Sequence, residues 1–393
     1  MPEYNNLFID MGYSQCCCHG ELICGDAIKF KRLPAEDRFI AVLSDGLGHG
    51  VKANILASMT TTMALKFIAE ELEIIHSAEI IMDALPVCQV RKISYSTFTI
   101  VDTRLNGETR VIEMGNPEFL LLRNGAQLRV PFEELNSPKY ENRTMRSYHF
   151  QGQPHDRLIF FSDGITQAGL GTPNYPLGWR LDGCLGYTQE LIRQKPDLSA
   201  HDLSGAILRE AVAKEAQLLP LDDMTCAVIY FRPPRKLMLF TGPPYHREHD
   251  HACAELLKNF DGAKVICGGT SATIISREWQ QEMTMDLATV GRDLPPISIM
   301  AGVDLITEGI FTLTRTAQYL EKDGSRQHND PAGRLMDLLL NNDIIEFVVG
   351  TRINEAHQDP NLPIDLEFRR NIVRRIANAL RDKYMKEVNI RFV

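Results

Sequence analysis

The amino-acid sequence predicts an α+β first domain and a second, α/β domain in a chain of 393 residues. Asn-Gly pairs at 106–107 and 124–125 stand between alternating apolar runs, the pattern of tight β-hairpins and therefore of antiparallel sheet. In the C-terminal part, short apolar runs alternate with helical stretches, which is typical of a mostly parallel sheet. Pro233-Pro234 separates the two patterns. We therefore expect domains at 1–232 and 235–393.

The elements of the first domain follow from their residue patterns. Residues 38–44 are apolar and β-branched, which indicates a buried strand, and residues 51–71 carry apolar side chains at helical spacing. The same criteria predict strands at 95–102, 109–114, 118–123, 126–130, 158–162 and 225–231, and helices at 74–87 and 198–217. Helices grouped around antiparallel strands predict a layered α+β fold.

The second domain is predicted from five short apolar runs with helical stretches between them. These runs are the expected strands 236–241, 263–267, 297–301, 344–349 and 388–393. Residues 303–307 resemble residues 162–166, but five residues can match by chance, so the similarity does not indicate an internal repeat. The alternation of strand and helix predicts parallel strand order.

Composition and charge exclude several classes of protein. With 44% hydrophobic and 24% charged residues, the chain has the composition of an ordinary globular protein. A net charge of −9 argues against a protein that coats nucleic acid or anionic lipid, and no apolar run reaches the length of a membrane span. The N-terminus lacks a signal-peptide pattern, so we expect a cytoplasmic protein whose nine cysteines are mostly reduced.

The stretch from Ser44 to Gly50, SDGLGHG, places an Asp and three glycines at the end of a predicted strand. A phosphate-binding P-loop needs a Lys followed by a hydroxyl residue, and a dinucleotide-binding turn needs GxGxxG; neither pattern is present. Taken alone, the stretch is consistent with a tight turn whose Asp caps the next helix, or with a metal site.

Other predicted strands also have carboxylates at their ends. Asp163 follows the strand at 158–162, and Asp222-Asp223 precedes the strand at 225–231. Strand ends that are distant in sequence can lie side by side, so these carboxylates and Asp45 can converge. Carboxylate oxygens, and a backbone carbonyl beside a glycine, are ligands that Mg²⁺ and Mn²⁺ prefer. The sequence therefore predicts a metal site.

Four motifs, in order, resemble those of the metal-dependent (PPM) Ser/Thr protein phosphatases. They are Cys24-Gly25-Asp26, Ser44-Asp45-Gly46-Leu47-Gly48-His49-Gly50, Phe161-Ser162-Asp163-Gly164 and Asp222-Asp223-Met224-Thr225. The second motif is similar to the turn of the bacterial sporulation stage II E (SpoIIE) branch, and the resemblance covers about residues 1–232. It implies an α-β-β-α sandwich that hydrolyses phosphoserine or phosphothreonine in a bacterial signalling protein, by analogy an anti-sigma-factor antagonist.

The resemblance also implies roles for individual residues. Asp45 would bridge two divalent ions, Mn²⁺ or Mg²⁺, with the Gly46 carbonyl as a ligand of one, while Asp163 and Asp222 complete the other. Asp26 would lie in the outer shell and hold metal-bound water. Two ions that share a carboxylate lower the pKa of the water between them and neutralise phosphate oxygens, so no protein nucleophile is required.

The same residues leave two alternatives open. Asp223 is an alternative to Asp222 as the ligand. Leu47 stands where the eukaryotic branch has a His that is thought to protonate the leaving oxygen, and no phosphate-binding Arg is identifiable near the start of the chain. His49 is an alternative acid, although a His in a glycine-rich turn more often packs or is solvated.

The competing hypothesis for function is a non-catalytic scaffold that binds a phosphoprotein and carries a ligand-sensing C-terminal domain. The Leu at position 47 favours this scaffold slightly. The complete carboxylate set favours the enzyme more, because acids at a converging site repel one another and have little structural use without cations.

Three other clusters favour structural roles. Residues 16–19, Cys-Cys-Cys-His, with Cys24 nearby, lack the CxxC spacing of zinc sites, so buried thiols in the first strand are expected. A second cluster consists of His246, His249 and His251, and these histidines are expected in a polar loop that leads into a helix. Five arginines between Arg369 and Arg381 are expected on the solvated face of a docked helix, rather than in a groove for nucleic acid or lipid.

A glycine turn follows the predicted strand at 263–267 in the second domain. Backbone N–H groups at a helix start, and the positive end of the helix dipole, bind anions, and glycines allow close approach. An ordinary capped turn, with Thr270 or Ser271 as the cap, explains the same residues. We expect a regulatory domain that binds a small anionic ligand at Gly268–Ser271, or a partner, and alters the phosphatase.

Overall fold

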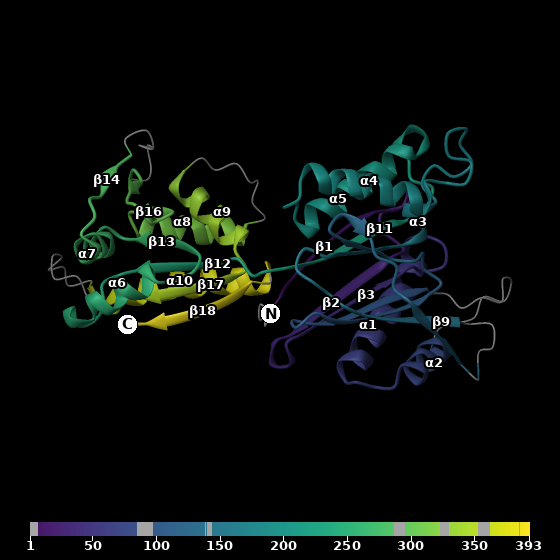
Figure 1. The fold of residues 1–393 in the computed structure, drawn as a ribbon, viewed down its shortest axis with the longest axis horizontal. Coiled ribbons are helices and arrows are strands. Elements are labelled where there is room, and N and C mark those ends of the chain that lie inside the picture. Colours follow the sequence, from purple (N-terminus) through teal and green to yellow (C-terminus); the bar gives the residue numbers. More distant parts are fainter. Residues whose placement is uncertain are drawn as a thin grey trace. The chain divides into compact units, whose positions relative to one another are not determined.

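The computed structural model describes residues 7–84, 97–137, 139, 144–286, 295–322, 330–352, 362–384 and 386–393, without the side chains of 362–367. The chain divides into two compact units, Met1–Pro233 and Pro234–Val393 (Figure 1). Parts of the predicted helix 74–87 and strand 95–102 lie outside the described residues.

Two antiparallel sheets form the centre of the first unit, with strand orders β1-β11-β10-β6-β7 and β2-β3-β4-β5-β9-β8. The strands are β1 (Phe8–Cys16), β2 (Ala27–Leu33), β3 (Arg38–Ser44), β4 (Phe98–Arg104), β5 (Glu108–Met114), β6 (Leu120–Arg123), β7 (Ala126–Gln127), β8 (Phe132–Asn136), β9 (Thr144–Gln151), β10 (Arg157–Phe161) and β11 (Met224–Arg232). The predicted turn between β6 and β7 is present, and its Asn124 and Gly125 both have positive φ, as a type I′ hairpin requires.

Helices cover the outer faces of both sheets (Figure 1). They are α1 (Gly50–Ala69), α2 (Ile74–Ala84), α3 (Asp163–Thr166), α4 (Arg180–Gln194) and α5 (Ala200–Lys214). Strand β3 is buried throughout because Phe39 and Leu43 pack between the sheets, while Ile40 and Val42 pack beneath α1 and α2. This double burial explains the continuous apolar run in the sequence. The predicted α-β-β-α sandwich is confirmed.

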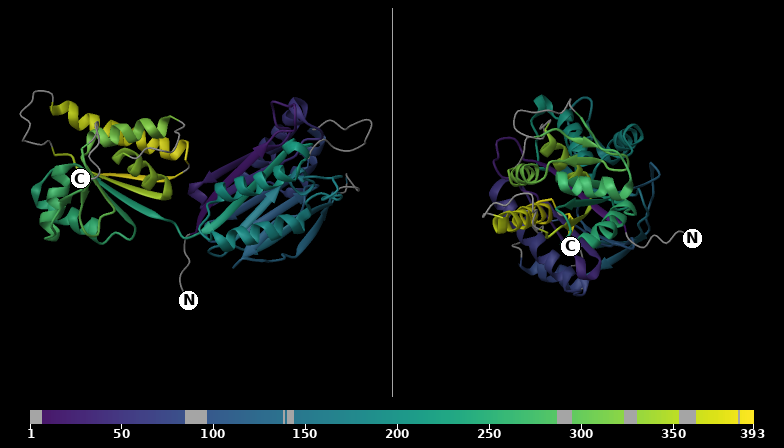
Figure 2. Two further views of the ribbon diagram at one scale, coloured as in Figure 1. Left: turned by 90° about the horizontal axis from the view of Figure 1, so that it is seen from above. Right: turned by 90° about the vertical axis from the view of Figure 1, so that its left-hand side faces the viewer.

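The second unit has one sheet, with strand order β14-β15-β16-β13-β12-β17-β18. Its strands β16, β13, β12, β17 and β18 are parallel to one another. Its strands are β12 (Lys236–Thr241), β13 (Ala263–Cys267), β14 (Thr284–Met285), β15 (Ser298–Ile299), β16 (Leu305–Thr307), β17 (Ile344–Val349) and β18 (Glu387–Phe392). Its helices, on both sides of the sheet (Figure 2), are α6 (Asp250–Lys258), α7 (Gly269–Trp279), α8 (Ile310–Glu321), α9 (Pro331–Asn341) and α10 (Leu362–Asp382). Leu239 packs under α8 to α10, and Phe240 under α6 and α7.

Several sequence predictions need correction. The expected strand 297–301 is reduced to the antiparallel pair of residues in β15, and β16 takes the parallel position beside β13. β16 is only three residues long, too short to show a periodic pattern. The sequence did not predict α4 either, because Gly183 and Gly186 weaken its helical pattern.

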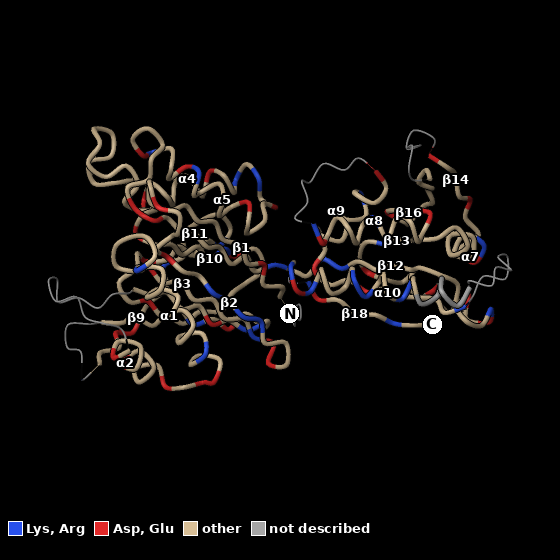
Figure 3. Tube along the Cα trace, turned by 180° about the vertical axis from the view of Figure 1, so that it is seen from behind, with Lys and Arg blue, Asp and Glu red and all other residues tan. Residues whose placement is uncertain are grey.

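The arginine-rich helix α10 docks on the sheet through Ile372, Val373 and Ile376, while Arg374 and Arg375 are exposed. Lys and Arg positions lie along this helix in Figure 3, and Arg375 forms an ion pair with Glu321 at 2.7 Å. Arg374, Arg375 and Arg381 thus form the predicted solvated basic face, whereas Arg369 and Arg370 are half-buried. Within the described residues, no helix is both long and apolar enough to cross a membrane.

Candidate active site

Four chain segments carry carboxylates to the same strand ends of the first unit. Asp26 immediately precedes β2 and Asp45 follows β3, and the pairing of Ala27 with Ser44 places these two residues side by side. Asp163 follows β10, and Asp222-Asp223 precedes β11, whose Cys226 pairs with Phe161. The antiparallel register thus explains each pair within its own sheet, and the hydrogen bond from Thr225 of β11 to Asp26 joins the ends of the two sheets.

The pKa shifts at the site show that these carboxylates lie close together. Burial raises the pKa of Asp45, and the charges of Asp26 and Asp163 raise it further. Burial also raises the pKa of Asp26, which hydrogen bonds from Thr225 and Ser162 partly offset. In the part of the chain that the structure describes, no Lys or Arg pairs with any of these carboxylates. The cluster is therefore strongly acidic and uncompensated.

Asp26 is fixed on one side only. The Thr225 hydroxyl donates to Asp26 Oδ2 at 2.7 Å, and the Thr225 N–H donates to the Ser162 hydroxyl at 2.9 Å. The other oxygen, Asp26 Oδ1, is buried and has no hydrogen-bond partner among the described residues. A buried carboxylate oxygen without a donor is costly, so this geometry favours a water or cation in front of it.

Asp222 and Asp223 point to different neighbours. Burial and the charge of Asp163 raise the pKa of Asp222, and the charge of Asp222 in turn raises the pKa of Asp45. Asp223 is 3% exposed and accepts a hydrogen bond from the Cys18 N–H at 3.0 Å. Asp222 thus lies near Asp45 and Asp163, whereas Asp223 lies near Asp26, with one oxygen bonded to the loop after β1 and the other, Oδ2, buried without a partner among the described residues.

The glycine turn after β3 packs tightly against α1. A Cβ at Gly46 would lie 2.3 Å from the Ala53 carbonyl oxygen, so only glycine fits there. The backbone carbonyl of Asp45 accepts from the Thr97 N–H at 3.1 Å. The N-cap of α1 is His49 rather than Asp45, so Asp45 does not cap the helix. His49 is exposed, and its Nδ1 lies 2.8 Å from Glu21 Oε1.

The cysteines do not all lie in the first strand, as the sequence had suggested, because β1 ends at Cys16. The loop that follows brings Cys17 and Cys24 within 4.8 Å of each other and of the Asp223 carboxylate, measured between ligand atoms. Burial raises the pKa of Cys24, and the charges of Asp26 and Asp223 add to the effect, which favours the neutral thiol. Three donors are fewer than the four of a closed zinc site.

His246 and His249 precede α6, in the polar segment that was predicted, whereas His251 lies in the first turn of the helix. His251 pairs with Glu278 at 3.2 Å, and the adjacent Asp250 pairs with Arg277 at 2.8 Å. These side chains have partners within the second unit.

Residues 35–232 match the sequence model of the family described as Stage II sporulation protein E (SpoIIE), just over half of the chain. The chain belongs to the SpoIIE family. Its first unit, called the SpoIIE domain from here on, is a PPM-type phosphatase domain, as the four motifs predicted. The match includes Asp45, Asp163 and Asp222, and it begins after Asp26.

Comparison with solved structures gives similarities at low identity. The phosphatase domain of the cell fate determinant SpoIIE from Bacillus subtilis is 18% identical, with 58% of this chain and 93% of that chain covered and a TM-score of 0.43. The RsbU and RsbW domains of a Mycobacterium tuberculosis protein are 17% identical, with 64% and 69% covered and a TM-score of 0.48. RsbX in complex with magnesium is 16% identical, with 57% and 95% covered and a TM-score of 0.41. No curated protein matches the chain.

Proposed function

We propose that the SpoIIE domain hydrolyses phosphoserine or phosphothreonine of a bacterial signalling protein, with two divalent cations, Mn²⁺ or Mg²⁺, as cofactors. The observation that carries this proposal is the convergence of carboxylates from four segments without a Lys or Arg partner among the described residues. Hard oxygen donors at this density fit Mg²⁺ or Mn²⁺. The buried, unpartnered Asp26 Oδ1 supports the same conclusion.

In this proposal Asp45, Asp163 and Asp222, with the Gly46 carbonyl, hold the cations. When bound, such ions lower the pKa of water and neutralise phosphate oxygens. Asp26, which Thr225 holds through Oδ2, keeps Oδ1 directed at the site, where it accepts a hydrogen bond from water and orients it. Leu47 has no proton to donate, so a leaving Ser or Thr oxygen takes its proton from water or from His49.

The substrate of this reaction, in our proposal, is a small phosphorylated regulator of the anti-sigma-factor antagonist type. This step rests on family resemblance alone. Incubation of such a phosphoprotein with the full chain and Mn²⁺ tests it, with release of phosphate as the readout. Hydrolysis of phosphopeptides without hydrolysis of that regulator would restrict the proposal to the reaction itself.

The experiment that tests the activity uses the purified chain with a phosphoserine peptide and Mn²⁺. Hydrolysis is expected to stop in chelator and to fall about a thousandfold in Asp163→Asn, because one cation loses a charged ligand. Asp182→Asn, an exposed Asp on α4, is the matched control and should keep full activity. Activity that persists unchanged in chelator contradicts the proposal. Mn²⁺ binding without turnover of any phosphopeptide would support the scaffold instead.

A further inference from the structure

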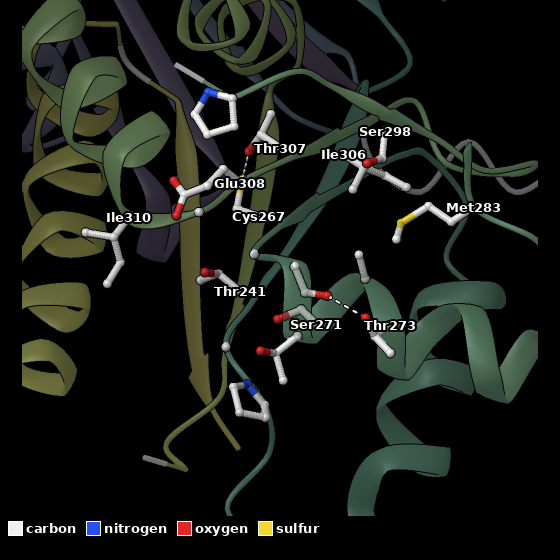
Figure 4. Close-up of a pocket in the computed structure, with 18 of the residues that line it drawn as sticks. Thr241, Cys267, Ser271, Thr273, Met283, Ser298, Ile306, Thr307, Glu308 and Ile310 are labelled. Carbon is white, nitrogen blue, oxygen red and sulfur yellow. Dashed lines mark hydrogen bonds between the residues drawn. The ribbon is translucent and has the colours of Figure 1, made fainter. Parts of the chain in front are cut away.

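A pocket of about 560 Å³ lies in the second unit, at the carboxyl ends of its parallel strands (Figure 4). Its walls come from Thr241, Cys267 and Thr307, the last residues of β12, β13 and β16, with Arg352 after β17. The chain places β13 and β16 on one side of β12, and β17 and β18 on the other. The pocket therefore lies where the strand order reverses, the place where open α/β sheets bind ligands.

One end of the pocket is suited to an anion. Gly268 has a φ of +128°, which favours glycine, and α7 begins immediately after it without a side-chain cap. The first intrahelical bond runs from the Ala272 N–H to the Gly268 carbonyl, so the amides of Gly269 and Ser271 precede the hydrogen-bonded ladder of the helix. The helix dipole adds a positive potential there.

Buried, unpartnered polar atoms that line the pocket make the second, independent observation. Ser271 is 1% exposed, and its hydroxyl has no hydrogen-bond partner among the described residues. Figure 4 shows the Ser271 hydroxyl pointing into the pocket, toward the side where Thr241 lies. Arg352 lines the same pocket, and its Nε and Nη1 are likewise buried and unpartnered in the described structure. Together with the open helix turn, these donors match the oxygens of a phosphate.

The other walls have different chemistry. Glu308, after β16, has one carboxylate oxygen buried without a partner among the described residues, so it is placed to accept a hydrogen bond from a hydroxyl group. Met283, Pro295 and Ile306 supply apolar surface. A ligand that satisfies all three walls carries a phosphate, a hydroxyl and an apolar ring, and the pocket volume suits a drug-sized molecule.

We propose that this pocket binds a nucleoside phosphate. Its phosphate lies at the start of α7 beside Ser271 and Arg352, a sugar hydroxyl donates to Glu308, and the base packs against Met283 and Pro295. The site lies entirely within the second unit and does not depend on the phosphatase activity of the SpoIIE domain.

Titration calorimetry on the full chain tests the proposal, with chelator present so that no cation bridges a phosphate to the acidic site. The probes are AMP, GMP, adenosine, guanosine and inorganic phosphate. We expect saturable binding of AMP or GMP, with inorganic phosphate and the matching nucleoside each about tenfold weaker or more. Arg352→Ala is expected to weaken nucleotide binding about tenfold and Ser271→Ala several-fold, whereas Arg374→Ala, an exposed arginine of α10, is the unchanged control.

Glu308→Gln separates the parts of the ligand. It should weaken the binding of the nucleotide and leave the binding of inorganic phosphate unchanged, because only the nucleotide offers a sugar hydroxyl. Wild-type protein without saturable binding of either nucleotide overturns the proposal. So does equal binding of inorganic phosphate and nucleotide, or an affinity that neither Arg352→Ala nor Ser271→Ala lowers while circular dichroism shows both variants folded.

Discussion

The two ends of strand β10 each carry a carboxylate, and the two carboxylates have opposite surroundings. Asp156, before the strand, is fully buried and accepts hydrogen bonds from Arg123 at 2.7 Å and from the Gln153 N–H at 2.9 Å. Asp163, after the strand, lies in the acidic cluster, and its carboxylate accepts a hydrogen bond from the Gln167 side chain, at 2.8 Å. A carboxylate paired within the chain stabilises the fold, whereas carboxylates gathered without a basic partner need a cation from solution.

The largest effect is expected at the unpaired end. Asp45→Asn removes the carboxylate at the centre of the cluster, so Mn²⁺-dependent hydrolysis should fall about a thousandfold. In chelator at neutral pH the same variant should unfold at a higher temperature than wild type, because the raised pKa makes the folded state take up a proton at Asp45 that the unfolded state releases, and Asn removes this cost. Initial rates and thermal unfolding measure both effects. A variant that keeps its activity and melts earlier would show that Asp45 is structural.

The opposite result is expected at the paired end. Asp156→Asn leaves Arg123 without its charged partner, which should lower the free energy of unfolding by about 3 kcal/mol. The kcat with Mn²⁺ should stay within about twofold of wild type, since uncoupled sites keep their own contributions. Urea unfolding and phosphopeptide kinetics test the pair of outcomes. Equal losses of stability in Asp156→Asn and Asp45→Asn would contradict the prediction that Asp156 stabilises the fold and Asp45 does not.

The contrast also explains how much of the site the sequence could predict. The sequence shows carboxylates beside buried strands, which it marks as apolar runs: Asp45, Asp163 and the pair at 222–223. Their convergence could therefore be predicted from these runs and from antiparallel pairing. The choice between Asp222 and Asp223 depends on side-chain direction, which the sequence does not carry. The proximity of Cys17 to Cys24 depends on the course of a loop, so the prediction that placed all these thiols in the first strand was wrong.

The fold shows the same limit. Strand β3 was predicted with its observed ends, since cores on both of its faces require an unbroken apolar run. β16 was missed because three buried residues form no period, and their position is fixed by pairing with β13. In the second unit the glycine turn was predictable, but the contribution of Arg352 was not, since it lines the pocket from the segment after β17, distant in sequence.

A third buried carboxylate sharpens the comparison by pH. Glu113 is 4% exposed and accepts from the Phe119 N–H at 2.9 Å, and burial raises its pKa to about 8, with Tyr148, Glu118 and Arg146 as the surrounding titratable groups. The folded state therefore holds a proton that the unfolded state releases near pH 4.5, so this stability is complete at low pH and is lost as pH rises toward 8.

Glu113→Gln removes that titration. The difference in stability between wild type and variant should therefore change with pH between 5 and 8, in the direction of a relatively less stable wild type at the higher pH. Urea midpoints at several pH values, all in Mn²⁺, measure it, because the contribution of the acidic site is common to both proteins. A difference that is independent of pH would mean that Glu113 ionises normally.

The smallest effect is expected at His49. Its side chain is exposed and held by Glu21, and its charge lowers the pKa of Asp222, so it lies at the edge of the acidic cluster. A general acid that protonates a Ser oxygen contributes about a hundredfold or more, and it matters little for p-nitrophenyl phosphate, whose leaving group needs no proton. We expect His49→Ala to lower the rates on a phosphoserine peptide and on p-nitrophenyl phosphate by the same small factor, because His49 acts through the charge of the site. A loss of about a hundredfold on the peptide alone would instead make His49 the acid that Leu47 does not supply.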